Sequence, residues 1–181
     1  MRIRFTLGLI VLAISLTSCG SSKDTPADAD ADGRPTTDSS VTQGDFTYRL
    51  VTSKPEYQHG EHVSIYAELT YVGNEPSVTI DHSDSPFYFP IQERTRNYAI
   101  DYAISDVGAS TTLVHGEPLR GSFDGGGAYG GDDRQAYKDF IEDYWKNGFP
   151  KGYYEVNGFA DFSVSGQRVK IGTRIDFIVG D

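Results

Sequence analysis

The side chains best suited to acid–base or metal chemistry occur in two short groups. His59 and His62 flank Glu61 at a turn that enters a predicted strand, so they lack the shared helical face of an HExxH zinc site. Residues 81–84 (Asp-His-Ser-Asp) contain the residue types of a hydrolase triad. Because a triad draws its members from separate segments, this group is interpreted as a turn. The sequence therefore predicts no catalytic residue, no enzyme activity and no cofactor.

A third group has the spacing of a calcium loop. Asp28, Asp30 and Asp32, with a glycine after them, match the first half of an EF-hand-type loop. The last ligand position would be Ser39 where a bidentate Glu is needed, and no helical pattern flanks the segment. An acidic spacer is the preferred interpretation. No metal site is predicted, and the three aspartates are a weak calcium candidate.

Aromatic residues make up 13% of the chain, which is more than a small domain needs for its core. Exposed tyrosines offer rigid, amphipathic contact area and can stack on sugar rings. Burial under a helix or a long loop would account for some of them equally well. Five fall on predicted outward positions or in loops and are candidate ligand contacts: Tyr66, Tyr88, Tyr129, Tyr153 and Phe159.

Composition limits the classes of protein and partner. The 181 residues suggest one domain with appendages. The 26 acidic residues outnumber the 16 lysines and arginines and give a net charge of −10, which argues against nucleic acid as a partner. A single cysteine excludes an intramolecular disulfide and a thiolate-rich zinc site.

The N-terminus has the pattern of a secretory signal peptide. Arg2 and Arg4 precede an apolar run over residues 5–16, which as a helix would extend about 18 Å and could not cross a bilayer core of about 30 Å. A short apolar run after a positive start is typical of a cleaved signal, here residues 1–18.

Residues 16–20 (Leu-Thr-Ser-Cys-Gly) resemble the lipobox of bacterial lipoproteins. The resemblance implies cleavage before Cys19, lipid attachment to its thiol and acylation of its amino group, with palmitate as a typical chain. Two or more chains anchor a protein durably. We therefore expect an extracytoplasmic protein held in the cell membrane by Cys19, or in the outer membrane if the cell has one.

Composition changes again near residue 45. Residues 19–44 are acidic and contain one large apolar side chain, Val41, so we predict a disordered linker. Residues 45–181 show the alternation of half-buried strands. About seven short strands with turn signals between them predict an all-β, antiparallel sandwich. The clearest runs cover residues 46–50, 63–71, 87–91, 98–105, 154–164 and 169–179.

One inserted α-helix is predicted near residues 132–147. Tyr137, Phe140, Ile141 and Tyr144 have helical spacing and predict an apolar face that covers an end or edge of the sandwich. Asp132 is the predicted N-cap, and Asn-Gly at 147–148 followed by proline predicts the end. The glycine-rich residues 125–131 before the helix lack a phosphate-loop motif and are interpreted as a mobile insertion.

Two stretches resemble a known family. Residues 52–63 (TSKPEYQHGEHV) and 149–156 (FPKGYYEV) resemble strand openings of bacterial extracellular immunoglobulin-like and macroglobulin-like domains, including relatives of the BsuPI-type proteinase inhibitor. The resemblance covers about residues 46–179 and implies the same fold. It also implies a tyrosine in the second stretch that packs its ring and bonds backbone through its hydroxyl.

These observations predict a membrane-anchored, extracytoplasmic, non-catalytic binding or accessory module of the cell envelope. Its expected partners are the bilayer, through acylated Cys19, and an envelope protein, peptide or glycan. The alternative is a proteinase-inhibitor-like domain that inserts an exposed loop, such as residues 121–131, into a protease cleft.

Overall fold

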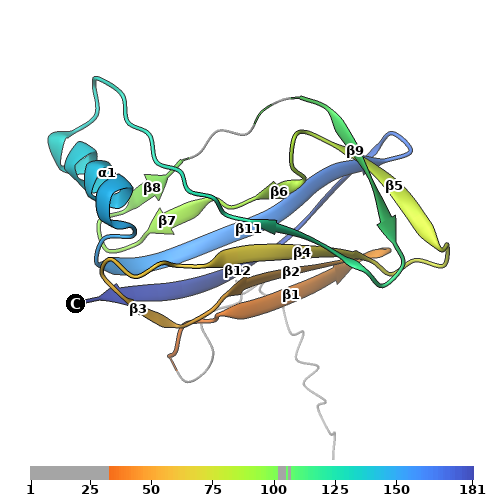
Figure 1. Ribbon diagram of the computed structural model, residues 1–181, viewed down its shortest axis with the longest axis horizontal. Helices are drawn as coiled ribbons and strands as arrows, with labels where there is room; N and C mark the ends of the chain where they lie inside the picture. The colour runs from red at the N-terminus through yellow and green to blue at the C-terminus, as the bar shows by residue number, and fades with distance from the viewer. Residues whose placement is uncertain (1–32, 102–104, 106) are drawn as a thin grey trace, which may run out of the picture.

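The computed structural model describes residues 33–101, 105 and 107–181, which form two packed β-sheets with an α-helix at one end (Figure 1). The first sheet has the order β1 (Asp38–Gln43), β2 (Phe46–Thr52), β4 (Ile65–Tyr71) and β10 (Pro118–Ser122). The second has the order β3 (Glu56–Gln58), β12 (Gln167–Gly180), β11 (Gly152–Val164), β5 (Ser77–His82) and β9 (Ala109–Val114). Short strands β6 (Phe87–Tyr88) and β7 (Ile91–Glu93) pair with β11, and β8 (Tyr98–Ile100) pairs with β7. The pairings are antiparallel apart from β3 with β12.

The core lies between the two sheets, and the inward side chains of the predicted alternation fill it. Fully buried residues on both sheets include Tyr48, Leu50, Leu69, Val156 and Phe177. Side chains that alternate in an extended strand reach opposite faces, so the apolar set of each strand meets the apolar set of the other sheet. The all-β sandwich is confirmed.

The strands that sequence reasoning missed are the ones with few buried residues. The described residues contain twelve strands rather than about seven. In β5 only Ile80 is buried, in β9 only Leu113, and β10 has no buried residue. Such strands are held mainly by backbone pairing, which leaves no apolar alternation to detect. The predicted strand over residues 98–105 ends at Ile100, and residues 102–104 and 106 lie outside the described part.

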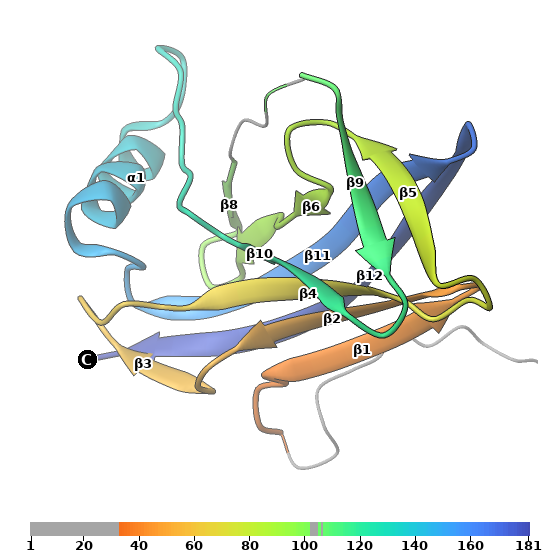
Figure 2. The same ribbon diagram turned by 45° about the vertical axis from the view of Figure 1, so that its right-hand side comes forward.

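The predicted helix is confirmed as α1 (Gln135–Asn147), which lies beside β8 at one end of the sandwich (Figure 2). Phe140, Ile141 and Tyr144 are buried, and Gly148 ends the helix with a φ of 81°. The predicted cap at Asp132 is wrong, because Arg134 occupies the N-cap without a side-chain bond. The neighbouring Asp133 instead accepts a hydrogen bond from the Gly130 amide at 2.6 Å.

Five aromatic side chains join α1 to the sandwich. Phe149 packs edge to face against Tyr144, Tyr154 and Phe177, with ring centroids 5.0–5.3 Å apart, and lies 6.2 Å from Phe123. The Tyr154 hydroxyl donates to the Pro150 carbonyl at 2.5 Å. A tyrosine that packs its ring and bonds the backbone was expected in this stretch, and Tyr154 has that geometry. The cluster holds α1 against one end of the β-sheets.

The structure corrects the last part of the predicted linker over residues 19–44, of which residues 19–32 lie outside the described residues. Asp38–Gln43 form β1, which pairs along its length with β2. Just before β1, the Thr36 amide donates to Asp176 Oδ1 at 2.5 Å, and the Thr36 carbonyl accepts from the Asp176 amide at 2.9 Å. This contact buries Asp176 to 5% exposure, although the alternation predicted it to face outward. Backbone pairing does not require apolar side chains, so a polar segment can form an edge strand.

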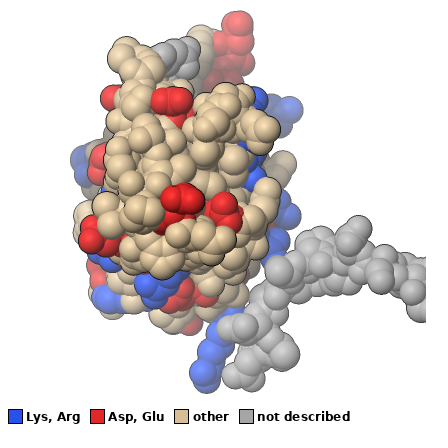
Figure 3. All heavy atoms as spheres, turned by 90° about the vertical axis from the view of Figure 1, so that its right-hand side faces the viewer, with Lys and Arg blue, Asp and Glu red and all other residues tan. Residues whose placement is uncertain are grey.

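The end of the sandwich opposite α1 carries dispersed charge. Figure 3 faces this end, where acidic and basic side chains are scattered among uncharged ones and basic side chains lie toward the margins of the view. This face differs from the α1 end, where aromatic side chains remain exposed and two hollows open.

Candidate functional site

The glycine-rich loop (residues 125–131) lies against α1. Three helix side chains donate to its carbonyls: Trp145 Nε1 to Gly126 at 3.1 Å, Tyr137 Oη to Ala128 at 3.1 Å and Lys138 Nζ to Gly131 at 2.7 Å. On the sheet side, the Gly127 amide donates to the Asp101 carbonyl at 2.5 Å. The sequence predicted a mobile insertion here and gave no sign of these contacts. The hydrogen bonds give the loop a defined path along the helix.

Two large aromatic side chains remain exposed where the loop meets the helix. Trp145 is 54% exposed and Tyr129 is 37% exposed. Their rings lie 5.4 Å apart at 31°, and the Tyr129 hydroxyl donates to Glu142 at 2.8 Å. That hydrogen bond is the main reason that the pKa of Tyr129 is raised. The pair forms an aromatic surface whose orientation is set by hydrogen bonds at both rings.

A hollow of about 610 Å³, here called the Trp145 hollow, opens beside this surface. Three segments form its walls: the β3–β4 connection with Glu61 and His62, residues 124–126, and the end of α1 with Tyr144 and Trp145. Burial raises the pKa of Tyr144. The walls combine the exposed Asp124 carboxylate and His62 imidazole with the aromatic ring of Trp145.

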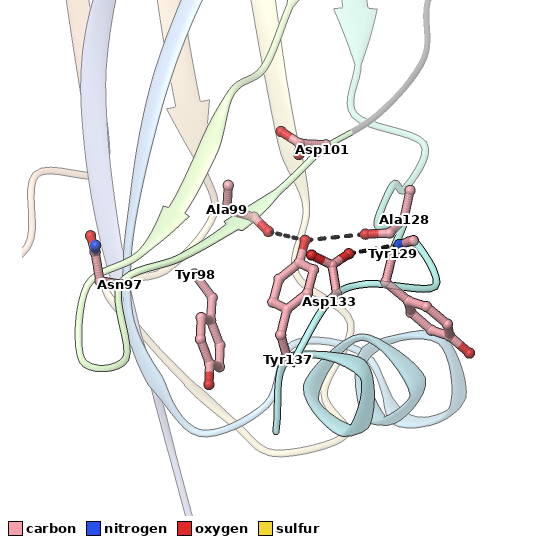
Figure 4. A pocket seen from close by; sticks show the side chains of 9 residues that line it. Asn97, Tyr98, Ala99, Asp101, Ala128, Tyr129, Asp133 and Tyr137 are labelled. Carbon is pink, nitrogen blue, oxygen red and sulfur yellow. Dashed lines mark hydrogen bonds between the residues drawn. The ribbon is translucent and has the colours of Figure 1, made fainter. Parts of the chain in front are cut away.

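A second hollow of about 500 Å³, the Tyr137 pocket, is lined by residues of β8, by residues 128–130 of the loop and by Tyr137 of α1 (Figure 4). The Tyr137 hydroxyl lies between the carbonyls of Ala99 and Ala128, at 2.9 and 3.1 Å. Burial and then the charges of Asp101 and Asp133 raise the pKa of Tyr137. Through these two hydrogen bonds, Tyr137 of α1 links β8 to the glycine-rich loop.

The five aromatic residues predicted as ligand contacts do not form one surface. Tyr66 on β4 lies under the Arg120 guanidinium, 4.0 Å from its ring centroid. Tyr88 stacks on Phe159 with centroids 4.8 Å apart, and Lys170 Nζ lies 3.8 Å from the centre of the Phe159 ring. These three rings are in contact with neighbouring side chains of the chain itself, which reduces the ring area that a ligand could reach.

Tyr153 is also engaged within the fold. Its hydroxyl donates to the Asp176 carboxylate, and burial followed by this hydrogen bond raises the pKa of Tyr153 to about 12. Tyr129 alone among the five packs against Trp145, and it lines the Tyr137 pocket. Whether any of the five contacts a ligand stays a prediction.

Trp145 was missed by sequence reasoning. It directly follows Tyr144, the last residue of the apolar spacing that predicts the buried face of α1. At about 100° per residue, Trp145 lies at the margin of the buried stripe, beside Ile141 and about 100° from Tyr144, so its ring can stay partly exposed. That offset, in the only tryptophan of the chain, was the available signal.

His59 and His82, from the two groups considered for metal binding and catalysis, contact different partners. His59 Nε2 lies 3.6 Å from Asp143 Oδ2, and His82 Nε2 lies 2.8 Å from Thr111 Oγ1. Asp81 and His82 belong to β5, so the turn predicted over residues 81–84 is wrong for its first half. Across residues 33–101, 105 and 107–181, no group of three or more His, Cys, Asp or Glu is placed to hold a metal ion.

The predicted anchor and calcium candidate are not part of this geometry. Cys19, Asp28, Asp30 and Asp32 lie outside the described residues. Within the described portion of the chain, no helix is long and apolar enough to span a bilayer.

Comparisons with known proteins leave the family open. No model of a known protein family matches the chain, and no curated protein matches it significantly. The resemblances to bacterial lipoproteins and to immunoglobulin-like or BsuPI-type domains therefore stay predictions. The established description of this chain is an all-β sandwich with a single helix in its described part, whose α1 end carries an exposed aromatic surface beside a hollow.

Proposed function

We propose that the protein is a non-catalytic, lipid-anchored binding module of the cell envelope and that it binds through its α1 end. The observation that carries this proposal is the exposure of Trp145 at the rim of the Trp145 hollow, with the exposed ring of Tyr129 packed against it. Exposed aromatic side chains with fixed orientation are typical of binding surfaces. The sandwich and the glycine-rich loop supply the rigid frame for that surface.

The anchor is supported by the sequence pattern around Cys19. A Cys19→Ser variant tests it by fractionation of cells that express the full chain. The wild type is expected in the membrane fraction and the variant in the soluble fraction, because acyl chains supply about 0.8 kcal/mol for each buried methylene group. A variant that remains in the membrane fraction as firmly as the wild type would overturn the lipid anchor.

The binding role is tested separately by co-sedimentation of the protein with purified cell-wall and membrane fractions. Trp145→Ala is expected to reduce binding, because it removes the most exposed aromatic ring of the α1 end. Tyr66→Ala is the matched control, since it removes a surface aromatic ring on β4 that lines neither hollow of the α1 end. Equal binding by the wild type and both variants, or no binding at all, would contradict the proposal.

The proteinase-inhibitor alternative requires residues 121–131 to enter a protease cleft. Gly121 and Ser122 pair with β4 as part of β10, and residues 126, 128 and 131 accept hydrogen bonds from α1 side chains. These contacts favour a loop that supports the α1 surface. Titration against secreted serine proteases decides between the two, since stoichiometric inhibition would support the alternative.

A further inference from the structure

We propose that the Trp145 hollow binds a segment of a carbohydrate chain, with one sugar ring stacked on the Trp145 indole. This inference rests on the proposed binding function and names the ligand class of the same site. Four features support it: the orientation of the indole, the space beside it, the chemistry of the walls and the accessibility of the ring face.

The indole is held in one orientation before any ligand arrives. Its Nε1–H donates to the Gly126 carbonyl at 3.1 Å, and the Tyr129 ring supports it from 5.4 Å away. Gly127 has a φ of 89°, and a Cβ there would lie 3.0 Å from Trp145 Nε1. The close approach of loop and indole therefore depends on a glycine. A ring that is already ordered loses little conformational entropy on binding.

The hollow beside the indole is open and sizeable. Its volume of about 610 Å³ is within the usual range for small-ligand sites and can hold a short run of sugar units. A pyranose has an apolar face of C–H groups and a rim of hydroxyls. Stacking of the C–H face on an aromatic ring removes apolar surface of both from water, and the hydroxyl rim needs polar partners around it.

The walls provide such partners. Asp124 and His62 are exposed on two different segments of the hollow. The Asp124 carboxylate can accept hydrogen bonds from hydroxyl groups, and the His62 imidazole can donate to them or accept from them. Among the described residues that line it, there is no lysine or arginine. A neutral, hydroxyl-rich ligand suits these walls better than an anionic one.

The ring face of Trp145 also differs from those of the other surface aromatics. Arg120 lies over Tyr66, and Lys170 lies over Phe159. In the part of the chain that the structure describes, no such cation lies over Trp145.

A basic peptide is the competing occupant because the walls are acidic. Glu61 is less available to it, since its carboxylate already pairs with Lys54 and accepts from the Gln58 amide at 3.1 Å. Of the four aromatic residues that line the hollow, Tyr144 and Phe149 are buried and Phe123 is half-buried. Trp145 alone has an exposed ring, whereas an aromatic cage for cations needs several converging rings. The geometry therefore favours a sugar.

The test uses the fluorescence of Trp145, which reports on this hollow alone because the chain has one tryptophan. The acylated full chain, in a polyoxyethylene detergent without sugar groups, is titrated with neutral tetrasaccharides built from glucose, mannose, galactose or N-acetylglucosamine. Tetralysine is titrated in parallel. A saturable change in emission with at least one tetrasaccharide, and none with tetralysine, is the expected result.

Variants assign the binding to the hollow by isothermal titration with the saccharide that binds. Trp145→Ala is expected to weaken binding about tenfold or more, while Trp145→Phe retains part of it because an aromatic face remains. Asp124→Ala is expected to weaken binding, and Tyr66→Ala to leave it unchanged. Circular dichroism confirms that each variant is folded.

Two results would overturn the inference: no response to any tetrasaccharide, or saturable binding of tetralysine alone, which would assign the hollow to a basic peptide. If Trp145→Ala still reduces binding to envelope fractions in either case, the proposed binding function stands and only the ligand class is wrong. If neither fractions nor saccharides bind, both proposals fail.

Discussion

The rings of Phe149 and Tyr154 meet edge to face, with centroids 5.0 Å apart and planes at 78°. Phe149 follows α1 in the chain, and Tyr154 is a fully buried residue of β11. This contact joins the helical end of the molecule to the sandwich core, and the position of the Trp145 hollow depends on it.

Phe149→Ala is expected to lower the free energy of unfolding by about 3–5 kcal/mol, because it leaves a cavity among four other aromatic rings. Tyr154→Phe keeps the ring and loses the hydroxyl that donates to Pro150, so about 1 kcal/mol is expected. Urea denaturation followed by circular dichroism measures both. Equal effects of the two substitutions would contradict the central place of Phe149.

Glu93 is fully buried and accepts hydrogen bonds from the amides of Thr95 and Arg96, at 2.8 and 2.7 Å. It thereby satisfies two backbone amides in the tight connection between β7 and β8. Glu93→Gln is expected to destabilise the protein by about 1–3 kcal/mol, since an amide cannot accept through both terminal atoms. Thermal unfolding measures the effect. The exposed Glu75→Gln is the control and is expected to change stability by less than about 0.5 kcal/mol.

Glu68 lies between Arg49 and Arg120 on the outer face of the first sheet, with Oε1 2.6 Å from Arg120 Nη2 and Oε2 3.1 Å from Arg49 Nη1. The hydrogen bond from Arg120 lowers the pKa of Glu68 below its ordinary value of 4.5, against the opposing effect of partial burial, and Arg49 adds to the lowering. A carboxyl with a lowered folded pKa stabilises the protein above its unfolded pKa. That contribution is lost as pH falls through the folded value.

Wild type and Glu68→Gln are therefore expected to differ by up to about 1 kcal/mol above pH 4.5, since both arginines are solvent-exposed and screened. The difference should shrink as the pH drops further. Urea denaturation at a series of pH values measures it. A difference that stays constant down to the acid limit would show that Glu68 does not titrate in this way.

The segment before residue 45 is expected to contribute to stability. A chain that begins at Asp45 lacks the β1–β2 ladder, the Thr36–Asp176 backbone pair and the hydrogen bond between Ser39 and Thr173. It should unfold more easily than a chain that begins at Gly33, by at least about 2 kcal/mol. Equal unfolding midpoints in urea would mean that β1 adds nothing to the domain.

Much of the core could be predicted from sequence because the signal is local. Within each strand, alternating residues share one side, and Leu50, Ala67 and Val156 belong to the apolar sides of three different strands. Burial of those sides is the largest favourable term in folding. The same reasoning placed α1 and its buried face, since Phe140, Ile141 and Tyr144 fall together at helical spacing.

What only the tertiary structure decided depends on neighbours that are remote in sequence. β1 exists because β2 offers a free edge, and Asp176 is buried because Thr36 lies across it. Tyr66 and Phe159 face outward as the alternation suggests, yet each ring is covered by a cation from a neighbouring strand, Arg120 of β10 or Lys170 of β12. Trp145 becomes a surface beside a hollow because the glycine-rich loop and the β3–β4 connection converge on the end of α1. Strand pairing, the covering of surface rings and the formation of a hollow all depend on which segments lie side by side in space. The local pattern of side chains along the chain carries no information about those contacts.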